Sequence, residues 1–219
     1  MRSYGQYCSV AKALDVLGDR WTLLIVRELL LRDGLRYTDL RQALPGIATN
    51  LLADRLRELE AAGVLTREEA EPPVATTLFH LTSRGEELRP VVEALGNWGL
   101  PLMAEGPAEG DVFRSHWLAF PAHVFLSDRA PAEPPLALEV RTGEEVGTIE
   151  ARDGEISTRL GGCADADLVL SGPPHPILGL LAGALDLPAA TAAGVAVEGD
   201  PGVLERLRPE GAPAANLSA

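Results

Sequence analysis

Residues 37–63 read YTDLRQALPGIATNLLADRLRELEAAG, and this stretch decides the fold of the first half of the chain. Residues 37–44 predict a short helix that Pro45-Gly46 ends, because proline removes a backbone donor and glycine favours turns. A longer helix is predicted from about Thr49 to Ala62, and Gly63 stops it. The stretch therefore predicts two short helices joined by a tight turn.

The second of these helices is amphipathic. Its buried stripe consists of leucines at i, i+4 and i+7, namely Leu52, Leu56 and Leu59. The opposite face is centred on Asn50, Asp54, Arg57 and Ala61. A short helix, a tight turn and an amphipathic helix form the helix-turn-helix plan, in which the second helix enters the major groove of DNA by its N-terminal half. Asparagine can pair bidentately with adenine, and arginine can reach guanine or phosphate, so Asn50, Arg55 and Arg57 are candidate DNA contacts.

The flanking segments complete a small domain. Residues 9–31 predict two helices separated by Gly18, with Asp19 as the N-cap of the second. Residues 64–67 and 77–81 predict two strands around a turn at Pro72-Pro73, which is the arrangement of a wing. Thr82-Ser83-Arg84-Gly85 leads into a last predicted helix, which bears Leu88, Val91, Val92 and Leu95 and ends near Trp98.

Charge is the main objection to DNA binding. The chain of 219 residues carries a net charge of −13, whereas phosphate neutralisation dominates affinity for DNA. The charge divides into −3 over residues 1–105 and −10 over residues 106–219, so most of it lies outside the predicted DNA-binding part. The N-terminus has no signal-peptide pattern, and no run of apolar residues is long enough to span a bilayer. We therefore expect a cytoplasmic protein without a membrane partner.

The first half resembles the HxlR family of winged-helix regulators, which is close to the MarR type in fold. The resemblance lies in the order and spacing of five pieces, namely residues 13–22 (ALDVLGDRWT), 27–29 (REL), 37–40 (YTDL), 51–60 (LLADRLRELE) and 81–85 (LTSRG). It implies a homodimer built from the terminal helices, a recognition helix in the major groove and a wing on the minor groove. The sequence departs from the family pattern in two places. Ala48 stands where a Ser or Thr cap is usual, so Thr49 is a candidate cap. The wing carries the acidic residues Glu68, Glu69 and Glu71 where a basic tip would favour contact with DNA.

On this reading the expected partner is a double-stranded DNA operator, and half-sites lie about one helical turn apart. The candidate contacts lie on the two helices and beside the wing: Tyr37, Thr38, Arg41, Thr49, Asn50, Ala53, Arg55, Arg57 and Thr76. A repressor is favoured over an activator, since blocking a promoter requires no contact with the polymerase.

Cys8 lies just before the first predicted helix. A thiol at a helix N-terminus has a lowered pKa, which makes it a candidate oxidant sensor. Some HxlR-type relatives have a sensing cysteine here, although Ser9 replaces the proline that commonly follows. The alternative is a small buried apolar residue without reactivity. The other cysteine, Cys163, is far away in sequence, so neither a disulfide framework nor a zinc site is indicated.

The second half predicts a small α+β domain after a linker at residues 105–110. An apolar helix or helix pair is expected from Phe113 to Phe125. Five strand-like segments follow, at residues 136–140, 146–151, 155–160, 167–172 and 195–200, with turns at Thr142-Gly143 and Asp153-Gly154. A helix bearing Ile177 precedes the last strand, and a short helix ends at Leu207.

This half resembles the sterol carrier protein type 2 fold, through residues 164–172 (ADADLVLSG), 177–185 (ILGLLAGAL) and 192–200 (AAGVAVEGD). The resemblance implies a cavity for a small apolar ligand between sheet and helices. Candidate lining residues are Trp117, Phe120, Leu178, Leu181 and Leu185, with simple core packing as the alternative for each. The tail 209–219 is expected to be disordered.

Catalytic chemistry is not visible in the sequence. His116 and His123 have no carboxylate or cysteine pair that would complete a metal set, and no nucleophile–base pattern or phosphate-binding glycine motif occurs. We therefore expect neither an enzyme nor a metal or other cofactor. The fold class is a mostly α winged helix-turn-helix domain over residues 1–105, followed by an α+β, sterol-carrier-like ligand-sensing domain with a five-stranded sheet over residues 106–219.

Two alternatives to a ligand-controlled regulator remain. One is redox control through Cys8, with the second half serving only dimerisation or structure. The other is a lipid or small-molecule binding protein whose first half has weak affinity for DNA.

Overall fold

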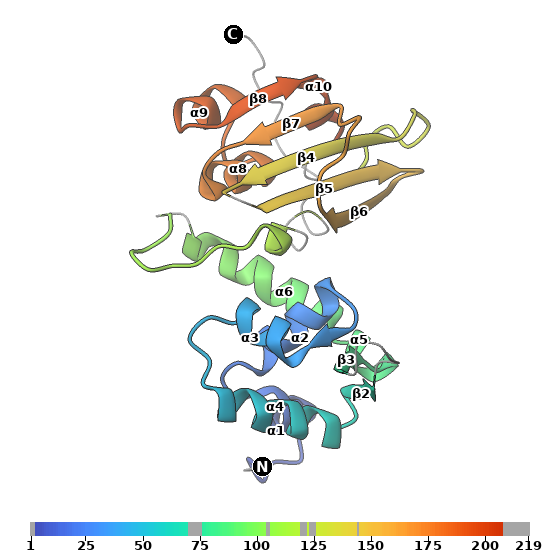
Figure 1. Cartoon of the computed structure of the whole chain (residues 1–219), viewed down its shortest axis with the longest axis vertical. Coiled ribbons are helices and arrows are strands. Elements are labelled where there is room, and N and C mark those ends of the chain that lie inside the picture. The colour runs from blue at the N-terminus through green and yellow to red at the C-terminus, as the bar shows by residue number, and fades with distance from the viewer. Residues whose placement is uncertain are drawn as a thin grey trace. The chain divides into compact units, whose positions relative to one another are not determined.

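The structure, a computed structural model, describes residues 3–69, 76–103, 106–118, 122, 126–143 and 145–207. It consists of two compact units, Met1–Leu95 and Gly96–Ala219, so their boundary lies before the expected linker. Helix α6 (Arg89–Gly99) includes residues of both units. Figure 1 shows the elements of each unit.

The first unit is a winged helix-turn-helix fold, as expected. Its helices before the boundary are α1 (Ser9–Leu17), α2 (Thr22–Leu31), α3 (Tyr37–Ala43), α4 (Thr49–Ala61) and α5 (Ser83–Glu86). Its strands are β1 (Leu35–Arg36), β2 (Leu65–Glu69) and β3 (Thr77–Leu81), which form an antiparallel sheet in the order β1-β3-β2. The short strand β1 was not predicted, because two residues give no periodic pattern.

The helix α4 ends where its sequence requires. Gly63 has a φ of +69°, a left-handed conformation that favours glycine, and follows the last helical residues directly. The N–H of Gly63 donates to the carbonyl of Glu60, and the N–H of Val64 to that of Leu59. Val64 is buried, so this turn directs the chain from α4 into the sheet.

The core of the first unit lies between the helices and the sheet. Its fully buried large side chains include Ile25, Leu40, Leu44, Leu52, Leu59 and Leu65. The predicted leucine stripe of α4 is confirmed, since Leu52, Leu56 and Leu59 are all buried. Burial of one such side chain stabilises a fold by about 1.5–3 kcal/mol, so the stripe fixes which face of α4 points outward.

One local prediction in this unit was wrong. The N-cap of α2 is Trp21 rather than Asp19, because an additional turn separates α1 from α2 and Trp21 adopts a φ of +79°. The predicted last helix is α6, which ends at Gly99; α5 precedes it, and Leu88 lies in the turn between them. Pro90 lies in the first turn of α6, where its missing N–H does not interrupt a helical hydrogen bond.

The second unit contains the predicted five-stranded sheet. Its strands are β4 (Leu136–Thr142), β5 (Glu145–Arg152), β6 (Glu155–Leu160), β7 (Leu168–Ser171) and β8 (Ala196–Gly199). The order is β6-β5-β4-β7-β8, with β4 and β7 parallel and every other pair antiparallel. The meander of hairpins over β4 to β6 is confirmed, and the parallel pair makes the sheet mixed.

Helices pack against one side of this sheet. They are α8 (Pro174–Leu181), α9 (Leu187–Ala192) and α10 (Gly202–Arg206), while η1 (Leu100–Met103) and η2 (Ser115–Leu118) are 3-10 helices. Leu138, Leu170 and Ile177 are fully buried and join strands and α8 in one core. Of the apolar helix or helix pair expected over 113–125, the described residues show η2 and a helical Ala122; residues 119–121 and 123–125 lie outside them.

Candidate nucleic-acid interface

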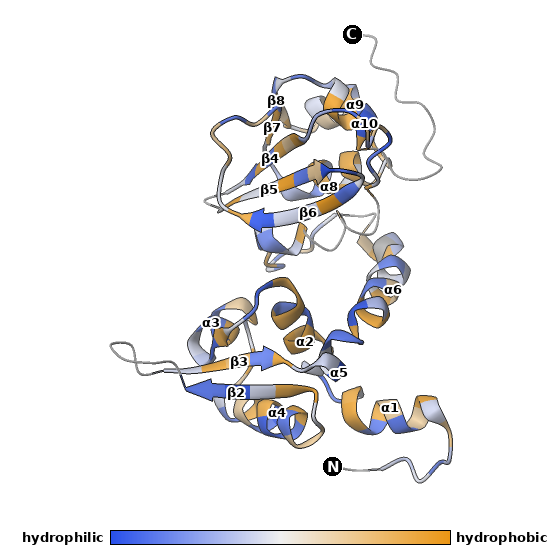
Figure 2. Cartoon of the chain, turned by 90° about the vertical axis from the view of Figure 1, so that its right-hand side faces the viewer, coloured by the Kyte–Doolittle hydropathy of each residue, from blue (hydrophilic) through white to orange (hydrophobic). Residues whose placement is uncertain are grey.

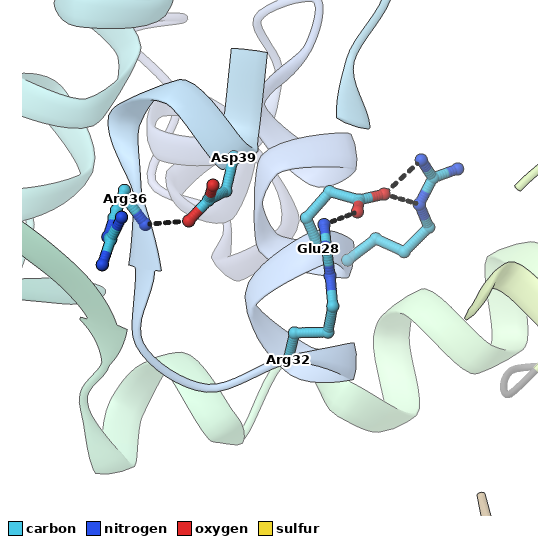
Figure 3. A network of polar contacts seen from close by, with 5 residues as sticks. Glu28, Arg32, Arg36 and Asp39 are labelled. Carbon is cyan, nitrogen blue, oxygen red and sulfur yellow. Dashed lines mark hydrogen bonds and ion pairs between the residues drawn. The ribbon is translucent and has the colours of Figure 1, made fainter. Parts of the chain in front are cut away.

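The two helices of the helix-turn-helix are joined by a direct hydrogen bond. Tyr37, the first residue of α3, donates its hydroxyl to the carbonyl oxygen of Thr49, the first residue of α4, over 2.6 Å. At the same end of α3, the backbone N–H of Arg36 donates to the carboxylate of Asp39 over 3.0 Å (Figure 3). These contacts hold the first turns of both helices together and leave Thr38 and Arg41 exposed.

The outer face of α4 is polar and accessible. Thr49, Asn50 and Arg57 are exposed, and Ala53 is half-buried between this face and the core. The Arg57 side chain retains 69% of its accessible surface and pairs with Asp54 one turn earlier. An exposed pair of this kind contributes about 0–1 kcal/mol, so a phosphate or a base edge can replace Asp54 as the partner of Arg57.

The N-terminus of α4 has no side-chain cap. Ala48 occupies the N-cap position with φ −70° and ψ 142°, and its methyl group accepts no hydrogen bond. The expectation that Thr49 takes the capping role is wrong, since Thr49 is already the first helical residue. The N–H groups of the first turn therefore lack a capping oxygen, and the positive end of the helix dipole suits an anion such as a DNA phosphate.

Arg55 lies away from this outer face. Its side chain is only 16% exposed, and its Nη1 donates to Asp19 over 2.5 Å and also to Glu58. The structure thus brings together Asn50 and Arg57, but it places Arg55 beside the turn between α1 and α2. A helical wheel could have separated the two arginines, because Arg55 lies at the border of the leucine stripe.

The wing is described only in its strands. Thr76 is half-buried and precedes β3, whereas Ala70 to Ala75, with Glu71, lie outside the described residues. Glu68 and Glu69 of β2 are exposed, and Glu69 accepts a hydrogen bond from the hydroxyl of Thr77 over 2.9 Å. The strands of the wing therefore present more negative than positive charge.

Cys8 is the N-cap residue of α1 and is exposed. The backbone N–H groups of Ala11 and Val10, at the start of α1, favour the thiolate and lower the pKa of Cys8 from its ordinary value of 9.0. The sequence predicted this direction, and the exposure removes the alternative of a buried filler. Cys163 is half-buried in the second unit, and both cysteines are free thiols.

The helices α1 and α6 expose apolar side chains. On α1 these are Val10 and Leu14, and on α6 they are Val91, Leu95 and Trp98. The three residues of α6 fall at i, i+4 and i+7, so they share one face. Both ribbons alternate apolar and polar positions in Figure 2. Large apolar side chains that share an exposed helical face mark a surface for association.

A buried ion cluster lies behind the helix-turn-helix. Glu28 of α2 has no accessible surface, and its carboxylate binds Arg27 over 2.7 Å and Arg32 over 3.1 Å (Figure 3). The sequence showed Glu28 only as part of a family motif, because burial of a charge cannot be read from periodicity. Two arginines on one carboxylate satisfy the buried charge, which makes this cluster part of the scaffold.

The candidate pocket residues of the second unit occupy different environments. Leu178 and Leu181 of α8 are buried in the core, and Leu185 is half-buried. Trp117 is half-buried and meets the ring of Phe113 edge-on, with 6.2 Å between ring centres. Phe120 lies outside the described residues. Of the five candidate pocket residues, the structure therefore places Leu178 and Leu181 in one apolar cluster.

Other site classes have little support in the described residues. Within them, no group of three or more His, Cys, Asp or Glu residues could hold a metal ion. None of the helices described there is long and apolar enough to cross a bilayer. The fold and the exposed face of α4 define the class of winged helix-turn-helix DNA-binding proteins.

Comparison with known proteins gives the family. A family model described as HxlR-like helix-turn-helix matches residues 16–106. The HTH-type transcriptional regulator sll1512 of Synechocystis sp. is 36% identical over 96 residues, which cover 43% of this chain and 70% of the relative. YvaP, an HTH-type transcriptional regulator of Bacillus subtilis, is 34% identical over 87 residues, covering 40% and 80%. The chain therefore belongs to the HxlR-like helix-turn-helix family of transcriptional regulators.

One solved structure of a transcriptional regulator is also similar to part of this chain. The reduced form of the transcriptional regulator YodB from B. subtilis shares 26% identity, covers 47% of this chain and 100% of its own, and has a TM-score of 0.40. The family assignment rests on the sequence relatives alone.

Proposed function

We propose that this regulator is a homodimeric repressor that reads a double-stranded DNA operator with α4. The observation that supports it most is the outer face of α4, where Asn50 and Arg57 are exposed beside a helix N-terminus without a cap. The amide of Asn50 would contact a base edge, and Arg57 a base or phosphate. Thr38, Arg41 and Thr49, which are also exposed, would contact the backbone; Arg55 has no place in this interface.

The dimer is proposed to form through α1 and α6. Their apolar side chains, among them Leu14, Leu95 and Trp98, are exposed to water. Burying them against a second copy would bring two α4 helices to one side of the DNA, as recognition of two half-sites requires.

The second unit is proposed to be a sterol-carrier-like sensor for a small apolar ligand. The mixed five-stranded sheet and the leucine-rich helix α8 support this assignment. Ligand would change repression only if it bound the DNA-competent and the DNA-free states with different affinities. Thermal unfolding of the full chain with oleate or with cholesterol tests the proposal, since a ligand of the folded state raises the melting temperature. No shift with either compound would count against an apolar sensor.

Redox control through Cys8 is a second candidate, favoured by the exposure of its thiol and its lowered pKa. Hydrogen peroxide would oxidise the thiolate to a sulfenic acid, with release of hydroxide, and the operator would then be released. A Cys8→Ser variant that still releases operator on peroxide treatment would exclude this route.

DNA binding itself is tested with the full reduced chain. The probe is a fluorescent duplex that the protein recovers from a random-sequence library, and the control is a scrambled duplex of equal composition. We expect tighter binding to the recovered duplex in fluorescence anisotropy, and affinity that falls with salt. Equal binding to both duplexes, or recovery of none, would contradict the proposed function.

A further inference from the structure

Helix α1 is held to the rest of the first unit by very little apolar burial. Ala11 is its only fully buried residue, Val16 and Leu17 are half-buried, and Val10 and Leu14 are exposed. A buried alanine contributes far less than a buried leucine, because it removes less apolar area from water. The orientation of α1 must therefore depend on other contacts.

The turn that follows α1 is sterically determined. A Cβ atom at Gly18 would lie 2.6 Å from the carbonyl oxygen of Leu14, so no other residue fits without a shift of the backbone. Three residues later, Trp21 takes a left-handed φ of +79°, which is unfavourable for a residue with a side chain. Asp19 lies between these two fixed points, and its carbonyl accepts the N–H of Thr22 over 3.2 Å.

A single ion pair connects this turn to α4. Asp19 and Arg55 are 36 positions apart in sequence, and Arg55 Nη1 donates to Asp19 Oδ2 over 2.5 Å. The same nitrogen binds Glu58 of α4, so the arginine is fixed from both sides. The Arg55 side chain is 16% exposed and the Asp19 side chain 56%, so solvent reaches the pair only from the side of Asp19.

A groove of about 540 Å³ lies beside this pair. Its walls include Leu14 and Asp15 of α1, the turn residues Gly18 and Asp19, and Arg55 and Glu58 of α4. Open space along the groove means that α1 and α4 are not packed against each other there. The Asp19–Arg55 pair is consequently the polar link across a poorly packed boundary.

We propose that Arg55 is a positioning residue for operator recognition, and that its ion pair with Asp19 sets the spacing between half-sites that the regulator accepts. This inference rests on the proposed dimer and on the proposed role of α4. If the partner copy packs on α1, the angle between α1 and α4 fixes the separation of the two recognition helices. Loss of the pair would let α4 adopt several angles, and operators of different spacing would then be bound with similar affinity.

The test uses the full chain and the duplex recovered from the random library, together with versions whose half-sites are one base pair closer or farther apart. The variants are Arg55→Gln, Asp19→Asn and their combination. A matched control is Arg152→Gln, the same change of charge at an exposed residue of the second unit. Affinities are measured by anisotropy at several salt concentrations.

We expect each single variant to bind the parent duplex about threefold to tenfold more weakly and to lose its preference over the altered spacings. The double variant should match Arg55→Gln, because Asp19→Asn acts through a pair that Arg55→Gln has already removed. Arg55→Lys should recover the spacing preference, since one nitrogen already serves both carboxylates. The slope of affinity with salt should stay unchanged, whereas a phosphate contact would lower it by about one.

A lower salt slope with the spacing preference retained would overturn the inference, because Arg55 would then contact DNA directly. Unchanged affinity and preference would overturn it equally. If the wild-type chain recovers no duplex, the proposed function fails, and hydrogen exchange then tests the pair alone. Amides of α1 should exchange faster in Arg55→Gln than in wild type or Arg152→Gln, and equal exchange would show that the pair does not hold α1.

Discussion

The hydroxyl of Tyr37 lies 2.6 Å from the carbonyl oxygen of Thr49, so the two helices of the DNA-binding motif are joined at their first turns. Both residues were predicted as DNA contacts, yet the hydroxyl of Tyr37 is already used within the protein. Tyr37 can therefore affect DNA recognition by holding the first turn of α4 in place.

The first prediction follows from this bond. Tyr37→Phe keeps the ring and removes the hydroxyl, and we expect a loss of about 0.5–1.5 kcal/mol in unfolding free energy and weaker operator binding. Urea unfolding and anisotropy measure the two effects. Tyr7→Phe is the control, because Tyr7 is fully exposed and its substitution should change neither. Equal behaviour of the two variants would show that the bond does not position α4.

The second prediction concerns the outer face of α4. Asn50→Ala and Arg57→Ala should each abolish specific operator binding while the melting temperature stays within about two degrees, since both side chains are exposed. Anisotropy with parent and scrambled duplexes measures the loss. Unchanged affinity in both variants would refute docking by α4.

The winged helix-turn-helix fold could be predicted because the sequence pattern of the first unit indicates which of its residues are buried. The leucines of α4, Gly63 and the turn at Pro45-Gly46 act through local spacing and backbone preference, and all behave as expected. The cap expected at Asp19 did not, because the left-handed conformation of Trp21 is set by tertiary packing rather than by periodicity.

The sequence predicted the kind of site, a DNA-binding helix face, better than it predicted which residues belong to it. Asn50 and Arg57 follow from the helical wheel alone. Arg55 has the same chemistry as Arg57, and its place at the border of the leucine stripe separates the two on the wheel. Its partner Asp19, however, is 36 positions away and could not be found from local spacing. The burial of the pocket candidates could not be predicted from residue type either. Leu181 and Trp117 are both apolar, but only Leu181 is buried in the core.

The third prediction is a loss of stability at low pH in the second unit. Arg206 binds both oxygens of the buried Asp128 carboxylate, over 2.7 Å and 2.9 Å, and lowers the pKa of Asp128 below its ordinary 3.8. A lowered carboxyl pKa stabilises the fold above the unfolded value, and this stabilisation is lost as pH falls through the folded value. Acid unfolding should therefore steepen below about pH 4.

Arg206→Met tests the same pair at neutral pH. Breaking this pair leaves the Asp128 carboxylate without its partner, so we expect a larger loss in unfolding free energy than removal of an exposed pair causes. The matched control is Arg159→Met, whose pair with Glu150 is exposed and should contribute less than about 1 kcal/mol. Similar losses in both variants would mean that the Arg206–Asp128 pair stabilises the fold no more than an exposed pair does.

The fourth prediction contrasts two glycines. A Cβ at Gly199 would lie 2.3 Å from the carbonyl oxygen of Asp167, and Gly199 has a φ of +102°. Gly199→Ala should therefore separate β8 from β7 and lower the melting temperature of the second unit strongly. Gly96 of α6 has open space at the Cβ position, so Gly96→Ala should stabilise the helix by about 0.5–1 kcal/mol. Calorimetry of both variants gives the comparison, and destabilisation by Gly96→Ala would indicate that this position is occupied in the assembled protein.

The last prediction concerns the chemistry of Cys8. Two backbone N–H groups at the start of α1 favour its thiolate, so the rate of alkylation by iodoacetamide should rise with pH to a midpoint below 9.0. A Cys163→Ser variant leaves Cys8 as the only thiol, and the same variant unfolded in urea provides the reference. Because the N–H groups act only while α1 is folded, unfolding should move the midpoint up to the ordinary value. A midpoint that is equal in the two states would mean that α1 does not activate the thiol, and the redox route would then have no chemical basis at this residue.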